Sequence, residues 1–323
     1  MAHPLVEKQA LHHGTSHSFA TNPNEPDAFG KEDLKMKQQY TTELLRRRAE
    51  SHMVRTLDER IPELKPYLKP GVKVLDVGCG VGSITLDVAQ VVKPGEVVGI
   101  EPVEYSVQVA CQLAKDRKVS NVSFEVGDSL SLRFPDDTFD IVYSYTVLHY
   151  FYDPERAVRE QKRVTKKGGW VIAAGVRDAG LVRRYPPCPA WENVIQMHAR
   201  YVDSRRDQPK LADLSCGQMQ AARRCPEYFI KAGLKDLELQ VKQYNLEYPG
   251  VDGMEPNVMD LLPWDGPDVT GNYASWERDY KAMVAEGFIS EETLKEAMEE
   301  AQAWYKNPHA FHFHAYVFAA GRA

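Results

Sequence analysis

The chain has 323 residues, of which 43% are hydrophobic and 27% are charged, a composition typical of a folded globular protein and unlike a disordered one. Its 40 Lys and Arg against 46 Asp and Glu give a formal net charge of −6, which argues against a nucleic-acid partner because no basic excess is present to bind phosphates. Residues 1–19 lack the basic start and apolar run of a secretory signal, and no segment reaches the apolar length of a membrane span. We therefore expect a cytoplasmic protein with no membrane partner.

The sequence pattern of residues 1–66 predicts two segments outside the main domain. Residues 1–30 contain several histidines, with Pro23 and Pro26, and no hydrophobic period, which indicates a flexible N-terminal arm. Residues 31–66 are charged and mostly helix-prone, with apolar residues spaced to form patches, so we expect a helical cap segment. Arg55 in this cap is a candidate for the cofactor carboxylate, and a solvated helix face is the alternative.

From Val72 short apolar runs alternate with amphipathic helices, which is typical of βαβ units and a parallel sheet. This core is expected to span residues 67–246 and to be completed by a final strand within 309–323. An insertion interrupts it at about 178–225, and a second, turn-rich and helical insertion on the substrate side covers 247–308. The expected strands are 72–77, 96–101, 122–126, 140–145, 170–176, 237–244 and 311–320.

Capping residues predict where two of the helices begin and end. Asp153 and Pro154 suit the start of a helix between the fourth and fifth strands, and Gly168-Gly169 is expected to end it. Ser290 is expected to cap the helix of the second insertion.

The first strand leads directly into a glycine-rich turn, Gly78 to Gly82, which a helix follows. Glycine has no side chain in the way, so such a turn lets the backbone approach a ligand closely. The next strands end in residues suited to a nucleoside: Glu101 can accept hydrogen bonds from both ribose hydroxyls, and Asp128 can accept one from an adenine amino group. Tyr145 ends the fourth strand beside the expected reaction centre. Because ligands bind at the carboxyl ends of strands in such sheets, a nucleotide-like cofactor is predicted here.

The spacing of the glycines distinguishes two cofactors. Dinucleotide oxidoreductases favour glycine at the sixth position of GxGxxG, and that position is Ser83 in this chain. The GxGxG spacing ending at Gly82 favours S-adenosylmethionine (SAM). An NAD(P)-dependent oxidoreductase and a glycine turn without a ligand remain the alternatives.

The stretch from about Tyr67 to Val176 resembles class I SAM-dependent methyltransferases, in particular the ubiquinone and menaquinone biosynthesis C-methyltransferases and related fungal small-molecule methyltransferases. LDVGCGVGSIT is similar to the first motif of that family, Ile100-Glu101-Pro102 to the second, GDSLSLRFPDDTFDIV to the third and fourth, and RVTKKGGWVIAAG to the fifth. The resemblance implies an α/β fold, a three-layer αβα Rossmann-like sandwich with a seven-stranded, mostly parallel sheet whose last strand is antiparallel. The two insertions have no general counterpart in the family, which leaves the acceptor open.

The resemblance also implies which residues line the cofactor. These are Gly78, Gly80, Gly82, Glu101, Pro102, Asp128 and Ser129. Asp76 and Cys79 of the first motif, and Tyr145 at the end of the fourth strand, are further candidates.

His149, four residues past Tyr145, is the candidate catalytic base because histidine titrates near neutrality. The resemblance offers an alternative, in which this histidine only packs against the sheet. No metal is expected. A zinc site from Cys188, His198, Cys216 and Cys225 would have unsuitable spacing, and His309, His312 and His314 have no predictable further ligand.

We therefore expect a SAM-dependent methyltransferase that acts on a small-molecule acceptor. Aromatic residues of the two insertions are expected to enclose a hydrophobic acceptor pocket. The alternative is a protein of the same fold that binds SAM without methyl transfer, either a rearrangement catalyst or a sensor. The acceptor atom and the oligomeric state cannot be read from the sequence.

Overall fold

The computed structural model of the chain describes residues 52–151, 153–177, 182–204, 220–247, 272–305 and 309–323, together with residues 46, 49, 50 and 307. The arm predicted at 1–30 and most of the predicted cap lie outside these residues. Of the cap, the structure describes helix α2 (Leu57–Arg60) and a 3-10 helix, η1 (Pro62–Tyr67). Leu57 and Leu64 from these two helices are buried in the main core.

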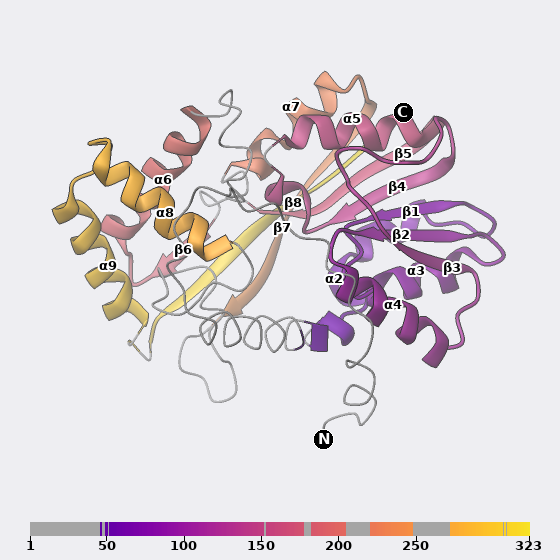
Figure 1. Ribbon diagram of the computed structural model, residues 1–323, viewed down its shortest axis with the longest axis horizontal. Coiled ribbons are helices and arrows are strands. Elements are labelled where there is room, and N and C mark those ends of the chain that lie inside the picture. The colour runs from indigo at the N-terminus through magenta and orange to yellow at the C-terminus, as the bar shows by residue number, and fades with distance from the viewer. Residues whose placement is uncertain are drawn as a thin grey trace, which may run out of the picture. The chain divides into compact units, whose positions relative to one another are not determined.

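All seven predicted strands are present in one sheet (Figure 1). The order is β3-β2-β1-β4-β5-β8, with β7 on the other edge of β8. Strands β1 to β5 are parallel, whereas β8 is antiparallel to β5 and to β7, so the predicted topology is confirmed. The bounds are β1 Val74–Val77, β2 Val97–Glu101, β3 Val122–Val126, β4 Phe139–Tyr145, β5 Thr165–Val176, β7 Lys235–Glu247 and β8 Phe311–Arg322.

An eighth strand, β6 (Val182–Tyr185), was not predicted. It pairs antiparallel with residues 311–314 of β8. This is the same edge of β8 that pairs with β5, whose partners are residues 317–322. The first insertion therefore contributes to the sheet. Its four residues, VRRY, are too short and too charged to be distinguished from a loop by their pattern.

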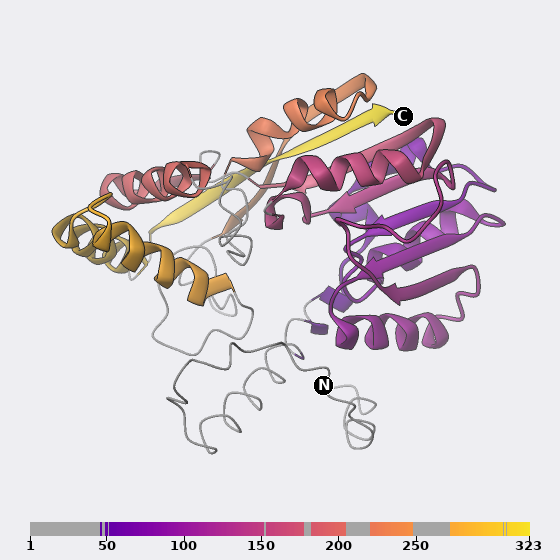
Figure 2. The same cartoon turned by 45° about the horizontal axis from the view of Figure 1, so that its top comes forward.

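Helices cover both faces of the sheet (Figures 1 and 2). Helices α3 (Ser83–Val92) and α4 (Glu104–Asp116) lie on one face, and α5 (Pro154–Val164) and α7 (Ala221–Lys231) lie on the other. Their apolar stripes form the two main hydrophobic clusters with the strands, which confirms the three-layer arrangement.

The start of α5 follows the prediction and its end does not. The Asp153 side chain accepts a hydrogen bond from the Arg156 N–H at 2.9 Å, and Pro154 is the first helical residue. The helix ends at Val164, however, and β5 begins at once with Thr165, which is paired with Phe139. The expected stop, Gly168-Gly169, lies inside β5, where the pairing with β4 shifts register. A bulge explains these glycines better than a helix end does.

Helices α6 (Pro189–Ser204), α8 (Asn272–Ala285) and α9 (Glu291–Tyr305) come from the two insertions and form a hydrophobic cluster of their own, which includes Trp191 and Trp304. The predicted cap of α9 is confirmed, since Ser290 Oγ accepts a hydrogen bond from the Thr293 N–H at 3.0 Å. In the part of the chain that the structure describes, no helix combines the length and apolar character of a membrane span.

Candidate functional site

A glycine-rich turn joins β1 to α3 at the carboxyl end of the sheet. Gly78, Gly80 and Gly82 have φ angles of 80°, 55° and 74°, in the left-handed region that residues with side chains avoid. The N–H groups of Gly78 and Cys79 both donate to the Ile100 carbonyl on β2, at 2.8 and 3.0 Å. The turn is therefore held to the end of the neighbouring strand.

The three glycines have different surroundings. A Cβ on Gly78 would lie 2.5 Å from a methyl group of Val147, and a Cβ on Gly82 would lie 2.5 Å from the Phe124 ring. A Cβ on Gly80 would have no neighbour closer than 4.0 Å. Packing therefore requires glycine at the first and third positions, whereas the space beside Gly80 is open to a ligand.

Glu101 ends β2 beside this turn. Its Oε2 atom accepts a hydrogen bond from the Gly80 N–H at 3.2 Å, and Oε1 accepts one from the Val103 N–H at 3.3 Å. The side chain is half-buried, and the next residue, Pro102, is exposed. The structure thus brings together Glu101 and the glycine turn, which the sequence predicted as parts of one site.

Asp128 and Ser129 follow β3, the strand next to β2. The Gly127 N–H donates to the Glu101 carbonyl at 3.2 Å, so this loop lies beside the end of β2. Asp128 is exposed and its Oδ1 accepts a hydrogen bond from the Leu130 N–H at 2.8 Å, whereas Ser129 is buried. The two carboxylates predicted to hold ribose and adenine therefore lie at adjacent strand ends of the same sheet edge.

Asp76 and Cys79 point into the protein. Asp76 is buried, and its Oδ2 accepts hydrogen bonds from Thr85 Oγ1 at 2.6 Å and from the Tyr143 hydroxyl at 2.5 Å. Burial raises the pKa of Asp76 to about 6, although both hydrogen bonds act in the opposite direction. The Cys79 thiol packs against Gly99, and burial raises its pKa well above the ordinary value. Contact of either residue with the cofactor stays a prediction.

The segment before α2 packs onto the start of α3, a contact that the sequence did not predict. Ser83 Oγ donates to the His52 carbonyl at 2.8 Å, and an Asp87 carboxylate oxygen accepts from the Leu57 N–H at 2.9 Å. These bonds join residues about thirty positions apart, so no local motif indicates them. They place Arg55, which lies between His52 and Leu57 in the chain, near the glycine turn.

The end of β4 has an unusual backbone. Thr146 has a φ angle of 54°, which is rare for a β-branched residue, and Gly175 on β5 has a φ angle of 63°. A Cβ on Gly175 would lie 2.8 Å from both Thr146 Cγ2 and Tyr145 Cε2. The Tyr145 ring therefore lies against Gly175. Backbone strain of this kind concentrates at functional sites, and here it occurs where the sequence predicted the reaction centre.

Three arginines act electrostatically on the Tyr145 hydroxyl. Burial raises the pKa of Tyr145, whereas the charges of Arg55, Arg60 and Arg177 lower it. These arginines come from the segment before α2, from the end of α2 and from the residue after β5. Of these three arginines the sequence indicates Arg55 alone, because no sequence pattern brings the three segments together.

His149 lies in a short 3-10 turn, η2 (Leu148–Tyr150), after β4. It is 6% exposed, and its Nδ1 accepts a hydrogen bond from the Arg177 N–H at 3.3 Å. Burial and the charge of Arg177 lower the pKa of His149 well below its usual value, so the ring is neutral with its proton on Nε2. These contacts favour the packing alternative, and a catalytic role for His149 stays a prediction.

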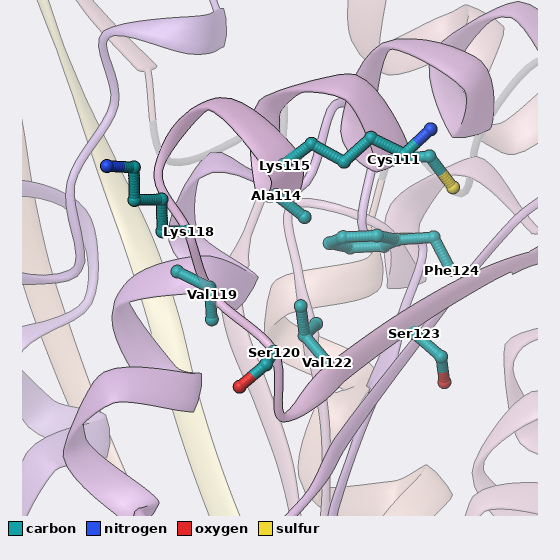
Figure 3. Close-up of a pocket in the computed structure, with 9 residues that line it drawn as sticks. All are labelled: Cys111, Ala114, Lys115, Lys118, Val119, Ser120, Val122, Ser123 and Phe124. Atoms are coloured by element: carbon teal, nitrogen blue, oxygen red, sulfur yellow. The ribbon is translucent and has the colours of Figure 1, made fainter.

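A cavity of about 470 Å³ lies between α4 and β3, outside this site (Figure 3). Lys115, Lys118 and the Phe124 ring are among its lining. It adjoins the start of β3, whereas Asp128 follows the end of that strand. The cavity is therefore separate from the predicted cofactor residues.

Among the residues that the structure describes, the candidate metal ligands do not form one cluster. Cys188 and Cys225 belong to different hydrophobic clusters, and Cys216 lies outside the described residues. His309 is exposed, and the side chains of His312 and His314 lie outside the described part.

Comparisons with known proteins agree with this geometry. A family described as a methyltransferase domain matches residues 68–227, which include every strand end discussed above. An uncharacterised methyltransferase of Schizosaccharomyces pombe is 41% identical over 160 residues, covering 47% of this chain and 56% of the relative. A probable methyltransferase of Aspergillus luteorubrus is 31% identical over 207 residues, covering 61% of this chain and 67% of the relative.

A demethylmenaquinone methyltransferase of a Geobacillus species is 37% identical over 116 residues, covering 36% of this chain and 50% of that protein. The chain spans about half the length of the first curated relatives that it matches. The family match at residues 68–227 spans strands β1 to β6 and includes helix α6 of the first insertion, whereas α8 and α9 of the second insertion lie beyond it.

Proposed function

Because this chain belongs to the SAM-dependent methyltransferases, we propose that it transfers a methyl group from SAM to a small-molecule acceptor. SAM supplies an electrophilic methyl group on a sulfonium when bound, so the protein contributes binding and orientation. Holding the acceptor in line with that methyl group accounts for several kcal/mol of rate enhancement.

The observation that supports this function best is the arrangement around Gly80. Its left-handed backbone leaves open space beside the turn, and its N–H already donates to Glu101. Asp128 lies at the next strand end. We assign the glycine turn to the amino-acid end of SAM, Glu101 to the ribose hydroxyls and Asp128 to the adenine amino group.

The acceptor is assigned to the ends of β4 and β5. Tyr145 and Thr146 lie there, one strand away from the glycine turn, since β4 pairs with β1. A base is needed only if the acceptor atom carries a proton that does not leave at the working pH. His149 is the candidate, with the packing alternative favoured by its contacts.

Two measurements test the proposal. Calorimetric titration should give binding of SAM and S-adenosylhomocysteine (SAH), and much weaker binding of NAD+ and NADP+, because Ser83 stands where a dinucleotide fingerprint has glycine. Tight NAD(P) binding without SAM binding would overturn the assignment.

The second measurement follows radioactive methyl groups from SAM into a panel of phenols, quinones, amines and thiols. Label in a product supports methyl transfer. If SAM binds but labels no acceptor in a broad panel, and a substrate is nevertheless rearranged, the protein uses SAM without methyl transfer.

A further inference from the structure

We propose that two copies of this chain associate through strand β7, which pairs antiparallel with its counterpart across a two-fold axis at Gln240. The pairing joins the two sheets edge to edge. The inference goes beyond the proposed function and does not depend on it, because it rests on the backbone and the side chains of β7.

Strand β7 is a long edge strand. Among the residues that the structure describes, it pairs with β8 and with no other strand, so its outer side presents backbone N–H and C=O groups that can pair with a further strand. Its pairing with β8 shifts register before Glu238 and again after Tyr244, and it is regular over residues 238–244 between these shifts. Irregularities twist an edge away from a partner, whereas a regular stretch can add a strand.

One face of this regular stretch is apolar and exposed. Leu237 packs against the cluster that contains Phe229 of α7, and side chains two positions apart lie on the same face of a strand. Leu239 and Val241 therefore lie on the α7 face of the sheet, yet they are 49% and 70% exposed. Edge strands of monomeric proteins usually carry charged residues or proline at such positions.

The opposite face of the stretch carries one acidic and one basic side chain. Glu238 accepts a hydrogen bond from the Tyr67 hydroxyl at 2.5 Å, and Lys242 forms an ion pair with Glu63 at 3.0 Å. These contacts with η1 hold both side chains on that face of the sheet. The two charges are placed symmetrically, two positions before and two positions after Gln240.

This pattern makes β7 complementary to a second copy of itself. In an antiparallel pair with its two-fold axis at Gln240, Leu239 of one copy lies opposite Val241 of the other on the apolar face. On the polar face, Glu238 of one copy lies opposite Lys242 of the other. Each apolar residue therefore faces an apolar residue, and each charge faces the opposite charge, twice in one dimer.

Neighbouring registers match less well. With the axis at Val241, Leu239 lies opposite the polar Gln243, and Glu238 has no cation opposite it. With the axis at Leu239, Val241 lies opposite Leu237, whose side chain already packs against the cluster beneath α7. The axis at Gln240 is the one that pairs the two exposed apolar residues with each other.

The contributions to this association differ in kind. Main-chain hydrogen bonds supply affinity in strand addition, and burial of Leu239 and Val241 adds to it. The exposed pairs between Glu238 and Lys242 contribute little energy, but they disfavour registers that bring like charges together. Because one strand per copy makes a small interface, we expect a reversible dimer.

The first experiment measures association of the full chain by sedimentation velocity at about 1 to 300 μM protein. We expect a dimer whose fraction grows with concentration. The double variant Leu239→Lys, Val241→Lys places like charges opposite each other and should raise the dissociation constant about tenfold or more. The double variant Leu239→Glu, Val241→Lys should recover most of the association, since each introduced acid faces an introduced base. Val91→Lys, at an exposed apolar position of α3, is the matched control and should change nothing.

The second experiment tests the register by cross-linking. Gln240→Cys should form a covalent dimer under a mild oxidant, because the two copies of residue 240 face each other with their Cβ atoms about 5 Å apart. Lys235→Cys is the matched control on the same strand and is also exposed. Its two copies lie roughly 33 Å apart in this register, so they should not cross-link. Wild-type protein controls for the native thiols, including the half-buried Cys111.

Three results overturn the inference. The first is a chain that stays monomeric at every concentration. The second is a dimer that forms equally well in the Leu239→Lys, Val241→Lys variant, and the third is equal cross-linking at positions 240 and 235, because either result places the interface elsewhere. Circular dichroism and thermal unfolding establish that each variant is folded. If the charged variants do not fold, cross-linking of Gln240→Cys against Lys235→Cys decides.

Discussion

The Tyr143 hydroxyl donates a 2.5 Å hydrogen bond to Oδ2 of Asp76, and this bond joins β4 to β1 directly before the glycine turn. Thr85 on α3 donates to the same oxygen at 2.6 Å. A buried carboxylate therefore connects the three elements that shape the turn. Burial disfavours its ionised form, which is why its pKa rises to about 6 despite two donated hydrogen bonds.

The raised pKa of Asp76 predicts a pH-dependent stability. A carboxyl group with a higher pKa in the folded state stabilises the fold fully below the unfolded pKa, and this contribution is lost as the pH rises through about 6. A shift from 3.8 to about 6 corresponds to about 3 kcal/mol between pH 4 and pH 7. Asp76→Asn removes this ionisation and keeps one acceptor oxygen. Urea unfolding should show the variant gaining stability relative to wild type as the pH rises, and a difference independent of pH would contradict the assignment.

Gly80→Ala should separate ligand binding from folding. Gly80 and Gly71 both have positive φ angles, 55° and 89°, and an added methyl group would have no close neighbour at either position. Each substitution should therefore destabilise the protein by a similar amount, about 1–2 kcal/mol, because of the left-handed backbone. Gly80→Ala alone should weaken SAM binding at least tenfold, since its methyl group would enter the space assigned to the cofactor. Equal SAM affinities in the two variants, measured by calorimetry, would remove the turn from the binding site.

Glu101→Gln should weaken SAM binding about 10- to 100-fold, as expected for loss of a charge-assisted hydrogen bond worth roughly 1.5–3 kcal/mol. The amide can still accept from the Gly80 N–H, so the turn should keep its conformation. Glu104→Gln is the matched control, because it removes the same charge three residues away on the exposed start of α4. Similar losses in both variants would indicate a general charge effect, which high salt would abolish.

The sheet and the glycine turn could be predicted because their signals are local. Strands β1 to β4 are short and rich in apolar residues, and the turn places glycines at positions where the backbone is left-handed. Glu101 and Asp128 could be predicted for the same reason, since Glu101 is the last residue of β2 and Asp128 comes two residues after the end of β3. Parallel strands then bring their carboxyl ends to one edge without further information.

The contacts that complete the site could not be predicted, because they join distant segments. The Tyr143 and Asp76 pair is 67 residues apart, and the bond from Ser83 to the His52 carbonyl spans 31 residues. The arginines that act on Tyr145 come from the segment before α2, from the end of α2 and from the residue after β5. The end of α5 was placed too late because a helix stop and a strand bulge use the same residue type, glycine.

His149→Gln distinguishes a base from a packing residue. The glutamine side-chain oxygen can accept the Arg177 N–H in place of Nδ1, so the local fold should survive. Removal of a catalytic base lowers kcat by about 10²- to 10⁴-fold, whereas loss of a packing residue has a far smaller effect on the chemical step. The ring is buried, and its unprotonated nitrogen, Nδ1, already accepts the Arg177 N–H. No free nitrogen is therefore left to accept a proton from the acceptor, so we expect kcat to fall less than about tenfold and the acid limb of its pH profile to stay in place. A large loss of kcat together with a displaced acid limb would establish His149 as the base.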